Sequence, residues 1–250
     1  AEAYYGKMGE DFAHATRARI HWICSQVSGK RILDVGCSQG ITAILLGREG
    51  HSVIGIDVAQ RSIKEARDYL AQEPPWVQAN IEFWNEDFLA GALDSQVFDT
   101  IILGEVLEHL TRPEAFLEAA ARRLPANGKL IVTVPFGIND WPDHKQTFYL
   151  MEPWRLLSER FEIVEVKLFG RWIGFVARLR GVADRGESVL PGPDLLAAFE
   201  ASVHDTERRL VSQVDALSRQ VAALQAEQAE AGKTLHDRLA QVDAARHEAA

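Results

Sequence analysis

The stretch that decides the fold is RILDVGCSQG, which runs from Arg31 to Gly40. Aliphatic residues lead into an aspartate, Asp34, and the chain then turns to glycine and small polar residues. Glycine at Gly36 and Gly40 allows a sharp backbone turn and lets a ligand approach the backbone closely. The pattern therefore predicts a buried strand, a ligand-binding loop, and a helix that begins near Ile41.

Short β-branched runs alternate with helical patterns as far as Arg180. The expected strands are Arg31–Val35, Ser52–Ile56, Ile81–Trp84, Thr100–Leu103, Leu130–Val134, Glu162–Phe169 and Ile173–Leu179. The expected helices between the early strands are Ile41–Glu49, Arg61–Gln72 and Pro113–Leu124. This spacing predicts right-handed crossovers in a doubly wound, mostly parallel α/β sheet, with the last two strands forming an antiparallel hairpin.

The composition changes after residue 180, which predicts a first domain over residues 1–180. Glycine and proline cluster over residues 181–194 and predict a linker. Residues 195–250 contain one glycine and no proline, and apolar residues recur there at alternating steps of three and four. These positions are Leu210, Val214, Leu217, Val221, Leu224, Ala231, Leu235 and Val242, with Gln228 as a polar interruption. The narrow seam predicts a long helix that self-associates as a coiled coil, and a lone helix packed on the core is the alternative.

Length and composition exclude several classes of protein. The 250 residues are 47% hydrophobic, which is enough for a full core, and no apolar run approaches the roughly 20 residues that span a bilayer. The only cysteines are Cys24 and Cys37, and no secretion-signal pattern opens the sequence, so a reducing cytoplasm is expected. A net charge of −9 without a Lys/Arg cluster argues against a nucleic-acid partner.

Two ligand chemistries compete for the glycine loop. A dinucleotide loop reads G-x-G-x-x-G and places a pyrophosphate at the helix N-terminus. Here Ser38 stands where the middle glycine would be, and Asp34 at the strand end suits a cation better than a pyrophosphate. Asp57 ends the second strand, where an acid can accept hydrogen bonds from both hydroxyls of a ribose. Asp87 follows the third strand, where it is positioned to meet an adenine amino group.

Five stretches together resemble the successive motifs of class I S-adenosylmethionine (SAM)-dependent methyltransferases. They are ILDVGCSQG, VIGID, NEDF, FDTIILGEVLEHL and LPANGKLIVTVP, in family order between about Tyr4 and Arg180. The resemblance implies a seven-stranded sheet whose last strand is antiparallel, with SAM as the cofactor. The residues it implies around SAM are Asp34, Gly36, Cys37, Ser38, Gly40, Asp57, Val58, Asp87, Phe88, Gly104 and Glu105. Ser38 departs from the family, which more often has glycine there.

The segments EVLEH and WPDHK carry the candidate catalytic groups. A hydroxyl acceptor must lose its proton to a base or have its pKa lowered by a metal. Glu105, Glu108 and His109 stand at i, i+3 and i+4, one face of a helical turn, and His144 follows the fifth strand. These four side chains resemble the ligands of metal-assisted O-methyltransferases that act on ubiquinone precursors or on the 3′-terminal 2′-hydroxyl of small RNAs. Two mechanisms stay open: a divalent ion, Mg or Mn, held by these four residues, or metal-free catalysis with His109 or His144 as the base beside Glu105.

The expected reaction is O-methylation of a sugar, a glycan or a similar polar metabolite. A methyltransferase joined to a coiled coil resembles bacterial enzymes that modify cell-surface glycans. The alternatives are a quinone-type small molecule, an RNA terminus, and a coiled-coil scaffold whose methyltransferase fold is inactive. The RNA alternative lacks a basic patch and stacking aromatics, and the intact Asp34, Gly36 and Asp57 argue against the inactive scaffold.

Overall fold

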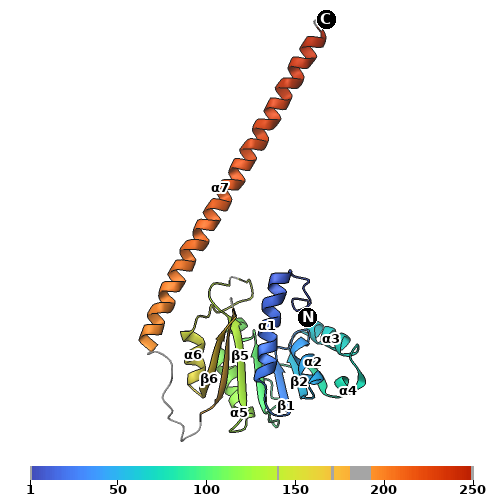
Figure 1. The fold of residues 1–250 in the computed structure, drawn as a ribbon, viewed down its shortest axis with the longest axis vertical. Helices are drawn as coiled ribbons and strands as arrows, with labels where there is room; N and C mark the ends of the chain where they lie inside the picture. Colours follow the sequence, from blue (N-terminus) through green and yellow to red (C-terminus); the bar gives the residue numbers. More distant parts are fainter. Residues whose placement is uncertain (1, 140, 170–171, 181–192, 249–250) are drawn as a thin grey trace. The chain divides into compact units, whose positions relative to one another are not determined.

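The structure, a computed structural model, describes residues 2–139, 141–169, 172–180 and 193–248 (Figure 1). The chain divides into two units, Ala1–Glu200 and Ala201–Ala250. Of the expected linker over residues 181–194, all but the last two residues lie outside the described part of the chain. The three domain boundaries expected from the sequence therefore stay predictions.

A seven-stranded sheet forms the centre of the first unit, in the order β3-β2-β1-β4-β5-β7-β6. Its strands are β1 (Arg31–Val35), β2 (Ser52–Asp57), β3 (Ile81–Asn85), β4 (Thr100–Gly104), β5 (Lys129–Pro135), β6 (Phe161–Leu168) and β7 (Trp172–Leu179). Strands β1 to β5 run parallel, and β7 runs antiparallel to both β5 and β6. The predicted doubly wound sheet with a terminal antiparallel hairpin is confirmed.

Helices cover both faces of the sheet, which is why its central strands are apolar on both sides. The helices of the first unit are α1 (Glu10–Gln26), α2 (Ile41–Arg48), α3 (Gln60–Leu70), α4 (Pro75–Gln78), the 3-10 helix η1 (Leu107–His109), α5 (Pro113–Arg123) and α6 (Met151–Ser158). Ile32 and Ile102 pack in one core cluster with residues of α1 to α4. Leu33 and Leu103 pack in the other cluster with residues of α5 and α6. Neighbouring strand residues thus pack into opposite cores.

The carboxyl ends of the parallel strands meet at one edge of the sheet. The chain order reverses there, because β1 pairs with β2 on one side and with β4 on the other. A doubly wound sheet leaves a crevice at this reversal, outside the strand ends, in which ligands bind. The loops that follow β1, β2, β3 and β4 therefore converge on one place.

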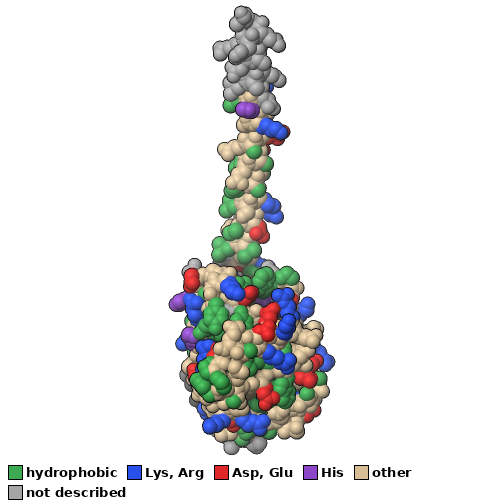
Figure 2. Space-filling model, turned by 90° about the vertical axis from the view of Figure 1, so that its right-hand side faces the viewer, with side chains coloured by type: hydrophobic (Ala, Val, Ile, Leu, Met, Phe, Trp, Pro, Cys, Tyr) green, Lys and Arg blue, Asp and Glu red, His purple; other side chains and the backbone are tan. Residues whose placement is uncertain are grey.

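Helix α7 (Pro193–Glu248) begins among the last residues of the first unit and makes up the described part of the second, which confirms the predicted long C-terminal helix. Most of the large apolar side chains that the structure describes on α7 lie exposed, and Figure 2 shows hydrophobic side chains at several levels of the helix. Leu217 is 60% exposed and Leu224 is 61% exposed. Self-association through these side chains stays a prediction. Within the described residues, no helix is both long and apolar enough to cross a bilayer.

Candidate active site

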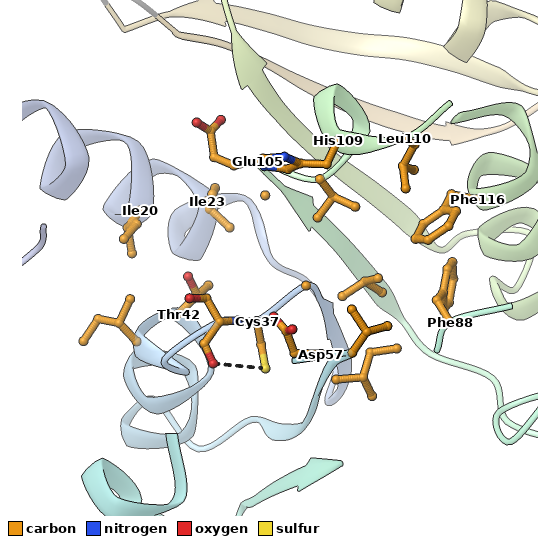
Figure 3. Close-up of a pocket in the computed structure, with 18 of the residues that line it drawn as sticks. Ile20, Ile23, Cys37, Thr42, Asp57, Phe88, Glu105, His109, Leu110 and Phe116 are labelled. Carbon is orange, nitrogen blue, oxygen red and sulfur yellow. Dashed lines mark hydrogen bonds between the residues drawn. The ribbon is translucent and has the colours of Figure 1, made fainter. Parts of the chain in front are cut away.

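A cavity of about 920 Å³ opens at the carboxyl ends of β1, β2 and β4 (Figure 3). The predicted cofactor residues that line it are Gly36, Cys37, Ser38, Asp57, Val58, Asp87, Phe88, Gly104 and Glu105. Two others, Asp34 and Gly40, do not line the cavity. The structure therefore brings most of the predicted cofactor residues to one cavity, as expected for loops that follow adjacent parallel strands.

The loop after β1 needs glycine at two positions. Gly36 has φ of +68°, and a Cβ atom there would lie 2.7 Å from Cγ2 of Val106. Gly40, the N-cap of α2, has φ of +74°, and a Cβ atom there would lie 2.4 Å from the ring of Phe83. Both positions lie in the left-handed region that glycine adopts without a steric penalty, so the loop shape depends on them.

Ser38, the position at which the sequence departs from the family, also has a left-handed backbone, with φ of +48°. Its backbone N–H donates to Oδ2 of Asp57 at 2.9 Å, which holds the loop against the end of β2. A non-glycine residue in this conformation carries strain. This conformation gives a physical reason for the family preference for glycine here.

Replacing Ser38 with Gly is expected to raise stability by about 0.5–1 kcal/mol, since relief of left-handed strain outweighs the added chain entropy. The variant keeps the N–H that bonds Asp57. Urea unfolding of wild type and Ser38→Gly measures the gain. Ser38→Ala is the matched control, because it keeps the Cβ atom and the strain; an equal gain in Ser38→Ala would contradict the strain argument.

Asp57 is held rigidly at the cavity wall. Its Oδ2 atom accepts from Ser38, and its Oδ1 atom accepts from the N–H of Ala59 at 2.8 Å. Each carboxylate oxygen has a second lone pair beyond these bonds. The group is thus a fixed acceptor beside the cavity, which suits the two hydroxyls of a ribose.

Phe88, which follows β3, and Phe116 of α5 form an aromatic wall of the cavity (Figure 3). Their ring centroids lie 5.3 Å apart, and the Arg123 guanidinium lies 5.1 Å from the centroid of the Phe88 ring. The neighbouring Asp87 is fixed by the N–H of Leu89, which donates to its Oδ1 atom at 2.9 Å. An apolar aromatic surface beside an acceptor fixed by this hydrogen bond suits a purine ring with an amino group.

Asp34 lies beneath the glycine loop, where it is 4% exposed and its Oδ2 atom has no hydrogen-bond partner among the described residues. Burial, and next the Asp57 carboxylate, raise the pKa of Asp34 to about 7, while a hydrogen bond from the backbone N–H of Ala43 opposes the rise. Asp34 is therefore a buried acid that ionises near neutral pH. Because Asp34 does not line the cavity, its expected contact with the cofactor stays a prediction.

The raised pKa predicts a pH dependence of stability. The pKa of Asp34 in the folded state exceeds the unfolded value of about 3.9, so ionising this carboxyl lowers the free energy of unfolding. The loss of stability is absent below about pH 4 and complete above about pH 7. The Asp34→Asn variant should therefore gain stability over wild type, by roughly 2–4 kcal/mol in all, as the pH rises through this window. Unfolding at pH 5 and pH 8 measures the difference. A difference that does not change between these two pH values would contradict the assignment.

Glu105 differs from the sequence expectation in its backbone. It has φ of +60°, and helical structure begins only at η1, so the expected single face of a helical turn is wrong. Its Oε1 atom lies 2.9 Å from Nη1 of Arg19, and Nε1 of Trp172 donates to its Oε2 atom at 2.6 Å. Burial raises the pKa of Glu105, and the Arg19 guanidinium opposes this rise. The Glu105 carboxylate thus forms an ion pair that joins α1 to the end of β4.

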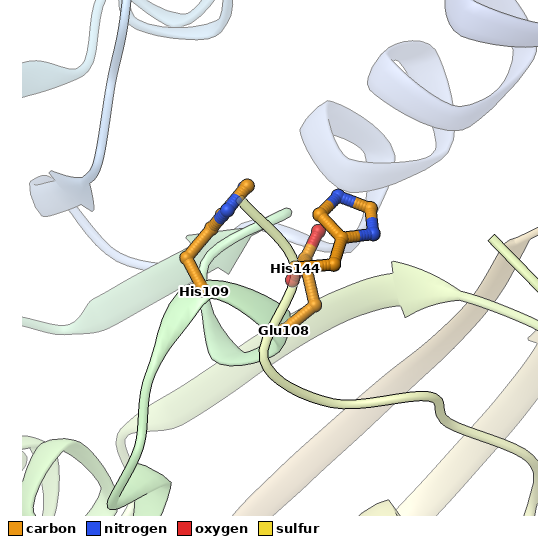
Figure 4. A group of neighbouring side chains, drawn as sticks. All are labelled: Glu108, His109 and His144. Atoms are coloured by element: carbon orange, nitrogen blue, oxygen red, sulfur yellow. The ribbon is translucent and has the colours of Figure 1, made fainter. Parts of the chain in front are cut away.

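Glu108, His109 and His144 form the group that can hold a metal, with one ligand atom from each within 4.8 Å of the others (Figure 4). Glu105, the fourth expected ligand, lies outside this group. Glu108 is 1% exposed, and neither of its carboxylate oxygens has a hydrogen-bond partner in the described part of the chain. Burial, and next the Glu105 carboxylate, raise the pKa of Glu108 to about 9. Two unpartnered oxygens beside two imidazoles fit a divalent cation.

The loop after β5 brings His144 to this group. The N–H groups of Lys145 and Gln146 both donate to the carbonyl oxygen of Glu108, at 2.7 and 3.2 Å. The ring centroids of His109 and His144 lie 4.9 Å apart, and Nδ1 of His109 lies 3.2 Å from Oδ2 of Asp143. Only His109 of the two imidazoles lines the large cavity, whereas His144 lines a smaller hollow next to it.

Sequence reasoning missed the contribution of α1 to the cavity wall. Thr16 and Arg19 lie three residues apart on α1 and line the cavity. The Thr16 hydroxyl and the Arg19 Nε atom are buried and have no hydrogen-bond partner among the described residues. The available sequence signal was the i, i+3 spacing of Thr16 and Arg19, which places a hydroxyl and a guanidinium on one face of α1. Without the fold, nothing indicated that this helix face meets the strand ends.

Comparisons with known proteins identify the family. A family model described as a methyltransferase domain matches residues 9–190. The chain is 32% identical over 114 residues to the ubiquinone biosynthesis O-methyltransferase of Coxiella burnetii, covering 45% of this chain and 47% of the relative. It is 34% identical over 110 residues to the mitochondrial ubiquinone biosynthesis O-methyltransferase of Bos taurus, covering 43% of this chain and 29% of the relative. The chain therefore spans less than half the length of either curated relative.

Solved structures share the fold. The magnesium protoporphyrin IX methyltransferase of Synechocystis PCC 6803, solved with bound SAM, superposes with a TM-score of 0.55. It is 18% identical, and the match covers 68% of this chain and 82% of that one, so it supports the fold alone. The family model covers most of the chain, and the sheet has the expected topology. The chain therefore belongs to the methyltransferase-domain family, as a class I SAM-dependent methyltransferase.

Proposed function

We propose that this chain transfers the methyl group of SAM to a hydroxyl of a quinone-type aromatic small molecule. The observation that carries the proposal is the position of the Glu108, His109 and His144 group beside a cavity whose other walls suit SAM. The curated relatives, named as ubiquinone biosynthesis O-methyltransferases, support this acceptor class better than the glycan expected from the sequence.

The cavity wall offers a complementary group for each part of SAM. Asp57 would accept hydrogen bonds from the ribose, and Phe88 would stack against the adenine. The unpartnered donors of Thr16 and Arg19 would bind the methionine carboxylate, since a guanidinium and a hydroxyl both donate to carboxylates. Ser38, in the glycine loop, would lie against the methionine chain.

Glu108, His109 and His144 would hold the metal if one is used. A divalent ion at this place would lower the pKa of an acceptor hydroxyl, which supplies the activation that an alcohol needs. The Asp143 carboxylate, 3.2 Å from Nδ1 of His109, would orient that imidazole. If no metal is used, His109 lines the cavity and is the better placed of the two imidazoles to take the acceptor proton.

The acceptor would lie against the apolar part of the wall near His109. Val106, Leu110 and Phe116 line the cavity there, and they give an aromatic ring a surface to pack on (Figure 3). A sugar would leave several of its hydroxyls without partners on such a surface. The wall therefore favours a phenolic or quinol acceptor.

The test incubates the full chain with SAM and with matched acceptors: a catechol, a hydroxylated quinol, a disaccharide and a short RNA. Mass spectrometry should show the addition of one CH2 unit to the catechol or quinol, with stoichiometric S-adenosylhomocysteine. Methylation of the disaccharide or the RNA alone would overturn the acceptor class. SAM binding by calorimetry with no methylation of any acceptor would favour the scaffold alternative.

A further inference from the structure

Helix α7 carries a regular apolar seam that the described part of the chain leaves exposed. With Gln228 at an a position of the heptad, Val214 and Val221 also fall at a. The residues at d are Leu210, Leu217 and Leu224, and their exposed fractions are 55%, 60% and 61%. Valine at a with leucine at d is the arrangement that favours two-stranded parallel coiled coils over trimers and tetramers.

Gln228, the polar residue in the seam, favours an identical helix as the partner and a parallel orientation of the pair. Gln228 lies in the same seam as Val221 and Leu224. In a parallel, in-register pair of identical helices it meets Gln228 of the other copy, and the two amides can bond each other. In an antiparallel pair it would meet an apolar d residue and lose its hydrogen bonds, at a cost in stability.

The flanks of the seam carry little charge that would oppose pairing of identical helices. In a parallel pair, the g and e positions that face each other include Gln213 with Ser218, Gln220 with Gln225 and Glu227 with Gly232. Only Glu227 among these is charged, and it faces a glycine, so two copies meet without like-charge repulsion at these pairs. Other charged residues nearby, such as Asp215 and Arg219, fall at outer positions.

We propose that the protein is a dimer in which two copies of α7 pair as a parallel, in-register coiled coil. The seam from Leu210 to Leu235 spans more than three heptads, or roughly 38 Å of helix, which is long enough for a specific seam. Because the helices run in parallel, the two methyltransferase units are attached at the same end of the coiled coil. This inference is independent of the proposed acceptor.

The first test is the mass of the full chain by light scattering over a range of concentrations. Wild type should give a dimer, and Val221→Glu with Leu224→Glu should halve the mass. The matched control, Ala216→Glu with Ala223→Glu, adds the same charge at outer c positions and should stay dimeric. SAM affinity should be equal in all three proteins. A wild-type monomer, trimer or tetramer would overturn the proposal, and so would dissociation of the control.

The second test is the direction of pairing. Gln228→Cys and Leu210→Cys, made separately, should each give a disulfide-linked dimer on mild oxidation, because equivalent a or d residues lie within disulfide reach in a parallel pair. The two sites are about 27 Å apart along the helix, so an antiparallel pair can link at most one of them. The native Cys24 and Cys37 are buried, so oxidised wild type is the control. Linkage at only one site, or at neither, would overturn parallel in-register pairing.

Discussion

If Glu108, His109 and His144 hold a divalent ion, a chelator is expected to abolish methyl transfer by this chain while leaving its affinity for SAM unchanged. The group that would hold the ion, Glu108, His109 and His144, is separate from Asp57 and the aromatic wall that would hold the cofactor. Turnover with and without chelator, with SAM binding followed by calorimetry, measures both effects. Activity restored by added Mg or Mn would identify the ion.

Glu108→Gln separates the two mechanisms open for this group. If Glu108 is a metal ligand, it is ionised, so the Glu108→Gln variant should lose turnover, as wild type does when the chelator is present. Without a metal, burial raises the pKa of Glu108 to about 9 and keeps the acid neutral, so an isosteric amide should leave turnover nearly unchanged.

Alanine variants of His109 and His144 test the role of each imidazole. His109→Ala should lower turnover by roughly 10²–10⁴-fold if it is the base, and His144→Ala should be impaired to a similar degree only if both hold an ion. His14→Ala, at an exposed imidazole of α1 outside the cavity wall, is the control. Full activity in both His109→Ala and His144→Ala would contradict both mechanisms and leave these side chains with a structural role.

Asp57→Ala is expected to weaken SAM binding by more than tenfold. The change removes the acceptor for two ribose hydroxyls, and hydrogen bonds to a charged group contribute roughly 1.5–3 kcal/mol. It also releases the N–H groups of Ser38 and Ala59, which now donate to this carboxylate, so the loss combines direct contact and loop order. Asp68→Ala is the matched control, because it removes the same charge from an exposed residue of α3.

Calorimetry with S-adenosylhomocysteine separates this effect from loss of the fold, provided that the unfolding midpoint of each variant is measured alongside. Unchanged affinity in Asp57→Ala would remove the ribose assignment. A loss of affinity that Asp68→Ala shares would show a general effect of charge.

The sheet could be predicted from the sequence because burial on both faces leaves continuous apolar runs. Every expected strand lies within one residue of the observed one at each end, and β1 matches at both ends. The short helices α4 and α6 were not predicted. Pro75–Gln78 is a single turn, and Met151–Ser158 contains a proline, Pro153, so neither shows a long helical period.

The site was predictable where a motif fixes the backbone and less so where distant segments meet. Gly36 and Asp57 come directly after strands, so their placement at the cavity follows from topology alone. The ion pair of Glu105 with Arg19 joins residues 86 positions apart, and spacing within EVLEH carries no trace of it. A helical turn was expected from that spacing, but the left-handed Glu105 removes it from the turn.

The ring of Phe83 on β3 occupies the space above two glycines at once. A Cβ atom on Gly40 would meet it at 2.4 Å, and one on Gly55 of β2 would meet it at 2.7 Å. These three positions are therefore coupled: a larger residue at Gly40 or Gly55 needs a smaller side chain in place of the ring, and at Gly40 it must also adopt the left-handed backbone, with φ of +74°. Among homologous sequences these three positions should covary. A smaller residue at Phe83 of β3 should arise before a larger residue at either glycine.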